Sequence, residues 1–235
     1  MGKGLAEVGS AWLSRNNPAA PSPVVAGGNL YGWNSRNVLC CWDALTGGIR
    51  WQAGEDTGGP QVLPAPAVAD GVVIVTDLEQ IRGHAVATGA VLWSQTLPGN
   101  GSTVLPQGGV AYVVDATGIL GAHRIQDGRR LWQTLLVQRE NGQRIDPITP
   151  CSDGRTLYGA GDFGVSAIDP ASRRLLWNQG QDEVTGGVPV VSGGYLYTTG
   201  DGGVLDLTTP SGRASTSSIR CTAPPRRPRS SSSIR

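Results

Sequence analysis

Two adjacent cysteines are the first residues in this sequence whose types and spacing could do chemistry. Cys40 and Cys41 carry neighbouring thiols that could pair in a disulfide, although free cysteines also pack as small apolar side chains inside a strand. The other two cysteines, Cys151 and Cys221, are isolated, and no C-x-x-C spacing occurs. We therefore expect no zinc site and no clear disulfide framework.

Two histidines form a second candidate group. His84 and His123 each lie four residues before a Thr-Gly or Asp-Gly pair, so they occupy the same place in two related segments. Imidazoles at equivalent places could converge and bind a metal ion or an acid. Trp42 and Ile168 hold the same place elsewhere in the chain. This favours packing, and we expect no metal site.

A glycine-rich stretch at 159–164 matches G-x-G-x-x-G and includes Asp-Phe-Gly. A dinucleotide-binding loop would open a helix after a strand. Here residues 165–168 continue a strand pattern, so we predict a turn. No kinase motif accompanies the Asp-Phe-Gly, and neither a Ser/His/Asp set nor a carboxylate pair is identifiable. The sequence favours a non-enzymatic protein without deciding the point.

The elements that must position these residues repeat along the chain. Four tryptophans end the same phrase at intervals of 42, 39 and 45 residues: Trp51, Trp93, Trp132 and Trp177. A second phrase, with a Gly-Gly or Asp-Gly turn, precedes each of them, and a fifth copy ends at Tyr197. Each unit reads as four short strands joined by turns, the pattern of a β-propeller blade.

This periodicity predicts an all-β fold, a β-propeller of about five four-stranded blades. We place the blades at 22–53, 64–95, 103–134, 147–179 and 187–210. Seven or eight such blades need about 290–330 residues, so 235 residues predict an incomplete ring. Residues 1–21 are interpreted as a remnant or a closing strand. The Ser/Arg/Pro-rich segment 211–235 is predicted to be a disordered tail.

Composition and charge exclude several classes of function. Glycine supplies 35 of the 235 residues, which suits many tight turns and argues against a helical bundle. Outside the tail, 13 basic and 18 acidic residues give a net charge of −5, so we expect no nucleic-acid partner. No apolar run approaches about 18 residues, so no transmembrane segment is expected. The first 23 residues show no signal peptide, which predicts a cytoplasmic protein.

The repeated phrase, A-x-D-x-x-T-G-x-x-x-W, resembles the repeat of PQQ-like propellers, the quinoprotein-like superfamily. Its tryptophan is kept in all four copies, whereas the Thr-Gly pair becomes Asp-Gly in the third and Ser172-Arg173 in the fourth. The resemblance implies that Trp51, Trp93, Trp132 and Trp177 dock each blade against the next. It also implies that three glycines form the turn before them: Gly47, Gly89 and Gly128.

The resemblance also has an implication for cofactor binding. PQQ-dependent alcohol dehydrogenases of this superfamily carry two adjacent cysteines in a vicinal disulfide against the quinone, which the resemblance would place at Cys40 and Cys41. Their calcium-ligand carboxylates and catalytic aspartate have no identifiable match here. We therefore expect no cofactor, and PQQ with calcium applies only if the chain is a dehydrogenase fragment.

An intact tryptophan framework without a catalytic set predicts a non-catalytic scaffold that binds a protein or a small-molecule ligand. Alternatively, the chain resembles a severed sensor region of a bacterial, notably actinobacterial, serine/threonine kinase. Eighteen arginines against one lysine fit a GC-rich genome of that kind. Similar repeats form the periplasmic scaffold lipoprotein of outer-membrane assembly, but that interpretation needs a signal peptide and a lipidation cysteine, which we do not identify. On these alternatives the chain is part of a larger polypeptide.

Overall fold

The computed structural model describes residues 22–54, 63–77, 79–136, 150–161, 164–179, 189–197, 204–206 and 214–215. All regular secondary structure in these residues is β-strand. The strands form five four-stranded antiparallel sheets, and neighbours in sequence are neighbours in space within each sheet. This confirms the predicted all-β fold of four-stranded units.

Each sheet takes four consecutive strands. The first sheet contains β1 (Val24–Ala26), β2 (Asn29–Trp33), β3 (Leu39–Asp43) and β4 (Ile49–Ala53). The second contains β5 (Ala67–Ala69), β6 (Val72–Asp77), β7 (Gln80–Ala85) and β8 (Val91–Thr96). The third contains β9 (Leu105–Gln107), β10 (Val110–Val114), β11 (Ile119–Arg124) and β12 (Arg130–Leu135). The fourth contains β13 (Cys151–Ser152), β14 (Leu157–Gly161), β15 (Gly164–Asp169) and β16 (Arg174–Gln179). The fifth contains β17 (Val190–Ser192), β18 (Tyr195–Tyr197), β19 (Val204–Asp206) and β20 (Ala214–Ser215).

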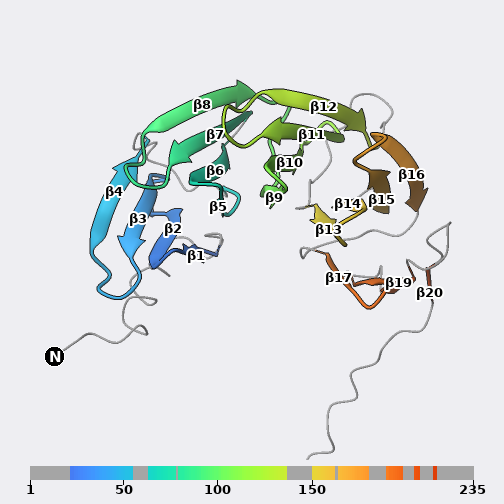
Figure 1. Cartoon of the computed structure of the whole chain (residues 1–235), viewed down its shortest axis with the longest axis horizontal. Coiled ribbons are helices and arrows are strands. Elements are labelled where there is room, and N and C mark those ends of the chain that lie inside the picture. Colours follow the sequence, from blue (N-terminus) through green and yellow to red (C-terminus); the bar gives the residue numbers. More distant parts are fainter. Residues whose placement is uncertain are drawn as a thin grey trace, which may run out of the picture.

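The sheets follow one another along an arc, and the described strands do not close it into a ring (Figure 1). The first strands of the sheets lie toward the inside of the arc, and β4, β8, β12 and β16 form its outer rim (Figure 1). Apolar side chains fill the space between consecutive sheets. Between the first two, for example, Tyr31 and Cys41 pack with Val73 and Val75. The core is therefore a series of sandwiched layers rather than one central cluster.

One turn geometry joins the third and fourth strands in four of the sheets. The backbone N–H of residue 47, 89, 128 or 173 donates to the carbonyl four residues earlier, at 2.7–2.9 Å. These residues have φ between 62° and 73°, the left-handed region that favours glycine. Gly47, Gly89 and Gly128 fit this need, whereas Arg173 adopts it as an exception.

The structure changes the predicted end of the fifth sheet, and it does not describe most of the two predicted terminal segments. β20 lies inside 211–235, so the fifth sheet extends to Ser215 rather than ending at Pro210. Strand pairing uses backbone groups, which a segment poor in apolar side chains still supplies. Residues 1–21 and 216–235 lie outside the described residues. No helix among the described residues is long and apolar enough to cross a membrane.

Candidate functional site

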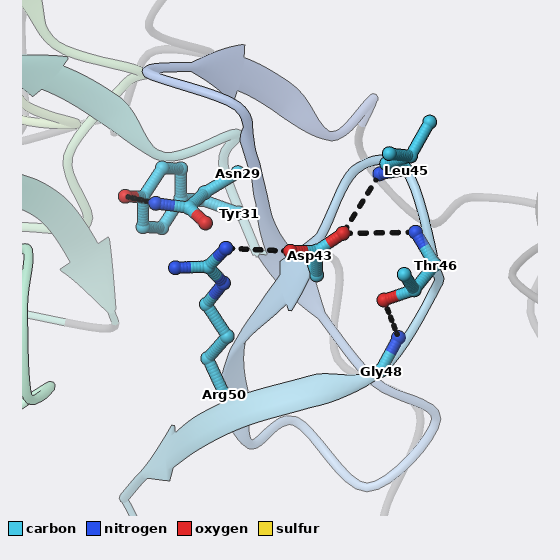
Figure 2. Close-up of polar contacts among 7 residues, drawn as sticks. All are labelled: Asn29, Tyr31, Asp43, Leu45, Thr46, Gly48 and Arg50. Atoms are coloured by element: carbon cyan, nitrogen blue, oxygen red, sulfur yellow. Dashed lines mark hydrogen bonds and ion pairs between the residues drawn. The ribbon is translucent and has the colours of Figure 1, made fainter.

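The turn of the first sheet uses its aspartate as a backbone acceptor. Oδ1 of Asp43 accepts N–H bonds from Leu45 at 3.0 Å and Thr46 at 2.8 Å, and Oδ2 accepts from Arg50 Nη2 at 2.5 Å (Figure 2). The Arg50 guanidinium and then the Thr46 backbone hold the pKa of Asp43 well below its usual range. The carboxylate therefore stays ionised and organises the turn, which does not suit a general acid.

The adjacent cysteines lie on opposite faces of β3, because successive side chains in a strand alternate. Cys41 packs with Trp51 toward the second sheet. Cys40 Sγ donates to the carbonyl of Val38 at 3.3 Å and accepts from Gln52 Nε2 at 3.4 Å. Both thiols are free and fully buried, and burial raises the pKa of each. This arrangement does not fit a vicinal disulfide against a quinone.

Both histidines are bound to the turn of their own sheet. Nδ1 of His84 lies 2.9 Å from the carbonyl oxygen of Gly89, and Nδ1 of His123 lies 3.2 Å from that of Gly128. Each follows a β-bulge in the strand, and both side chains are buried. Burial lowers the pKa of each imidazole. Within the described ranges, no group of three His, Cys, Asp or Glu residues could hold a metal ion.

Two of the four tryptophans reach across to the following sheet. Nε1–H of Trp51 donates to the carbonyl of Val86 at 2.9 Å, and Nε1–H of Trp93 donates to that of Ile125 at 2.8 Å. Each ring lies directly on the turn glycine of the next sheet. A Cβ on Gly89 would come within 2.5 Å of the Trp51 ring, and one on Gly128 within 2.4 Å of the Trp93 ring. The glycine is therefore needed for the ring above it as well as for its φ.

The junction between the third and fourth sheets departs from this arrangement. Arg173 holds the turn position, with φ 62°, and brings a Cβ where the other turns leave room for a ring. Trp132 is only partly buried, and it packs against Tyr112 with ring centroids 5.9 Å apart. Trp177 is also partly buried, with its ring centroid 6.1 Å from that of Tyr158.

Exposed arginines and leucines lie on β12 and β16 and in the turns that precede these strands, and exposed apolar side chains also lie on β4 and β8. We name the following residues the arginine–leucine patch: Arg129, Arg130, Leu131, Arg173, Arg174, Leu175 and Leu176. All of them are exposed. The sequence reasoning did not single out these residues. Their signal was the replacement of the Thr-Gly phrase by Asp-Gly-Arg-Arg and Ser-Arg-Arg in the third and fourth copies.

The glycine-rich stretch lies partly outside the described residues, at positions 162 and 163. On its two sides Gly161 pairs with Gly164, and β15 follows at once. A strand therefore stands where a dinucleotide-binding loop would open a helix, as the sequence predicted.

Comparison with known proteins gives a consistent family match. A family model described as outer membrane protein assembly factor BamB, of the PQQ-like repeat type, matches residues 7–154 and 161–215. The curated BamB of Yersinia pestis is 26% identical over 186 residues, which cover 72% of this chain and 46% of that protein. The chain thus spans about half the length of this relative. This outer-membrane relative gives no support to the predicted cytoplasmic location.

Solved structures agree on the fold. BamB from Moraxella catarrhalis matches with a TM-score of 0.64 at 19% identity, over 82% of this chain and 61% of that one. A quinohemoprotein alcohol dehydrogenase from Comamonas testosteroni matches with a TM-score of 0.60 at 16% identity, over 81% and 40%. Because one fold serves both a membrane-assembly factor and an oxidoreductase, these likenesses establish the β-propeller architecture alone.

Proposed function

The chain belongs to the family of the outer membrane protein assembly factor BamB, and on that premise we propose that it is a non-catalytic scaffold. It binds another protein outside the cytoplasm and supports the assembly of outer-membrane proteins. Because the chain spans about half of the Yersinia pestis relative, the proposal concerns the protein to which these sheets belong.

The state of the reactive side chains supports a non-catalytic role most directly. Both histidines are buried with Nδ1 bound to a turn carbonyl, and Asp43 is occupied by two backbone N–H groups and Arg50. The buried cysteines have raised thiol pKa values, which disfavour the nucleophilic thiolate. These groups organise turns and strands, while the solvent-facing turns and outer strands remain for binding.

The proposed role is tested by deleting the gene in its own organism and quantifying the proteins of the outer-membrane fraction by mass spectrometry. We expect several outer-membrane proteins to fall together and to recover when the gene is restored on a plasmid. Fractionation of the restored strain, with protease added to spheroplasts, should find the protein outside the cytoplasm. Unchanged outer-membrane proteins, or a protease-protected cytoplasmic product, would contradict the proposal.

Two other functions remain separate predictions with their own tests. A dehydrogenase fragment requires that the purified chain bind PQQ with calcium and reduce a dye when given an alcohol. A severed kinase sensor region requires an upstream reading frame that encodes a kinase domain. The scaffold proposal expects no turnover in the first test and no kinase frame in the second.

A further inference from the structure

We propose that the arginine–leucine patch on the third and fourth sheets docks an acidic, partly apolar segment of a partner protein. This inference rests on the scaffold function proposed above and names the chemistry of its partner. The patch combines three independent features, which are its charge, its exposed apolar side chains and an unfavourable backbone conformation retained at its centre.

Charge is distributed unevenly over the turns of the arc. In and beside the turns that join the first to the second strand and the third to the fourth strand, the third and fourth sheets carry six arginines against three aspartates: Arg124, Arg129, Arg130, Arg155, Arg173 and Arg174, and Asp127, Asp153 and Asp169. The equivalent turns of the first two sheets carry one arginine and two aspartates: Arg50, Asp43 and Asp70. These turns are therefore more positive in the third and fourth sheets than in the first two, which favours an acidic partner and orients it.

The three aspartates of these turns each form an ion pair or a hydrogen bond within their own sheet. Asp127 pairs with Arg124 at 3.3 Å. Asp153 accepts the hydroxyl of Tyr158 at 3.0 Å, and Asp169 accepts that of Ser172 at 2.6 Å. Among the described residues of the two sheets, Arg124–Asp127 is the only ion pair. Arg124 is not a residue of the patch, so among the described residues the arginines of the patch are exposed and form no ion pair with these carboxylates.

Apolar side chains follow the arginines directly in sequence. Leu131, Leu175 and Leu176 are 38%, 42% and 53% exposed on β12 and β16, which succeed each other along the outer rim (Figure 1). The partly buried Trp132 and Trp177 lie on the same two strands. Arginine and tryptophan are enriched among the residues that carry protein–protein binding energy, and the exposed leucines beside them add apolar area that a partner can cover. This mixture fits a protein segment better than a nucleic-acid backbone, which would need charge alone.

Arg173 adds a conformational argument. It keeps a left-handed φ of 62° at the place where the three preceding turns have glycine. A side chain at such a position is strained, and strain retained in one copy of a repeat points to a use for that side chain. Trp132, on the outer strand of the preceding sheet, is partly exposed and adds aromatic surface near the positive charge of these turns.

The experiment titrates the full chain with a fluorescent peptide of alternating glutamate and leucine and measures anisotropy at low and moderate salt. We expect saturable, salt-sensitive binding, and we expect peptides of alternating lysine and leucine or glutamate and serine to bind much more weakly. The variant R130Q/R174Q should lose about tenfold in affinity. The variant R36Q/R50Q removes the same charge from the first sheet and should change affinity by less than about twofold.

The variant L176S tests the apolar component without changing charge, and it should also weaken binding. Unchanged thermal unfolding midpoints would show that all three variants are folded. Equal losses in the two arginine variants, equal binding of the glutamate–serine peptide, or comparable binding of a single-stranded oligonucleotide would overturn the proposal. So would a dimer, seen by light scattering, that R130Q/R174Q dissociates. None of these results bears on the gene-deletion test, so the two proposals fail separately.

Discussion

The indole ring of Trp93 lies directly on Gly128 of the following sheet, so closely that a Cβ on that glycine would stand 2.4 Å from the ring. The same ring covers Gly83 of its own sheet, where a Cβ would stand 2.3 Å away. Trp93 is thus held between two glycines, and its Nε1–H donates to the carbonyl of Ile125 at 2.8 Å. This contact joins the second and third sheets.

Replacing Gly128 with alanine should destabilise the protein strongly. The new Cβ both overlaps the Trp93 ring and adopts a left-handed φ of 70°, which together cost about 2–4 kcal/mol. Gly71→Ala is the matched control, because φ is 77° there and nothing lies within 4 Å of the added Cβ. It should cost about 1 kcal/mol. Equal shifts of the two urea midpoints would argue against the ring contact.

Trp93→Ala and Trp132→Ala should differ in effect. Trp93 is 7% exposed, and its truncation should cost about 3–5 kcal/mol. Trp132 is only partly buried, so its truncation should cost clearly less. Chemical denaturation of both variants measures the difference. A larger loss of unfolding free energy for Trp132→Ala would show that the contact between the third and fourth sheets is the more stabilising one.

Arg173→Gly should stabilise the fold while weakening the patch. Glycine relieves the strain of a φ of 62°, which should raise the free energy of unfolding by about 0.5–1 kcal/mol after its own entropy cost. Arg174→Gly, one residue later in β16, should instead destabilise, because glycine weakens a strand. If both variants lose stability alike, then Arg173 carries no strain.

Stability should fall on mild acidification because of the two buried histidines. Burial lowers the pKa of His84 and His123 below the ordinary 6.5, so the unfolded chain binds more protons than the folded one. The nearby Arg82 also lowers the pKa of His84 while Asp77 raises it, and Arg130 lowers that of His123. The histidine contribution is therefore present at neutral pH and is lost as pH falls through 6.5 toward the folded-state values.

Urea midpoints between about pH 7.5 and about pH 5.5 measure this effect. The variant H84I/H123I, which copies Ile168 of the fourth sheet, should have a flatter profile over that range. A wild-type profile that is flat, or that rises on acidification, would show that the imidazoles are charged or exposed in the folded protein.

Sequence pattern alone predicted several features of the fold and the site. The period of the tryptophans predicted four-stranded sheets, and the Thr-Gly phrase predicted the turns at Gly47, Gly89 and Gly128. The expectation that His84 and His123 serve packing rather than metal binding came from the Trp42 and Ile168 found at the same place. It stays a prediction, although both imidazoles bind the carbonyl oxygen of their own turn glycine.

Other particulars could not be predicted, because they depend on contacts between residues far apart in the chain. No local pattern pairs Trp93 with Gly128, since that contact forms only when the third sheet packs on the second. The same holds for the packing of Cys41 against Val73 and Val75 of the second sheet. The boundary of the fifth sheet was missed because the segment is poor in apolar residues, whereas the pairing of β20 with β19 uses backbone groups.

The sequence by itself determined the repeat, the strand order within each sheet and the glycine turns, because these depend on hydrophobic alternation and local backbone conformation. Only the tertiary structure decided which face of each sheet is covered and which turns stay exposed. Arg173 shows the reason. An arginine where the other turns have glycine is one letter in the sequence, but the left-handed φ that it adopts and the partial burial of Trp132 are set only where strands and sheets pack together.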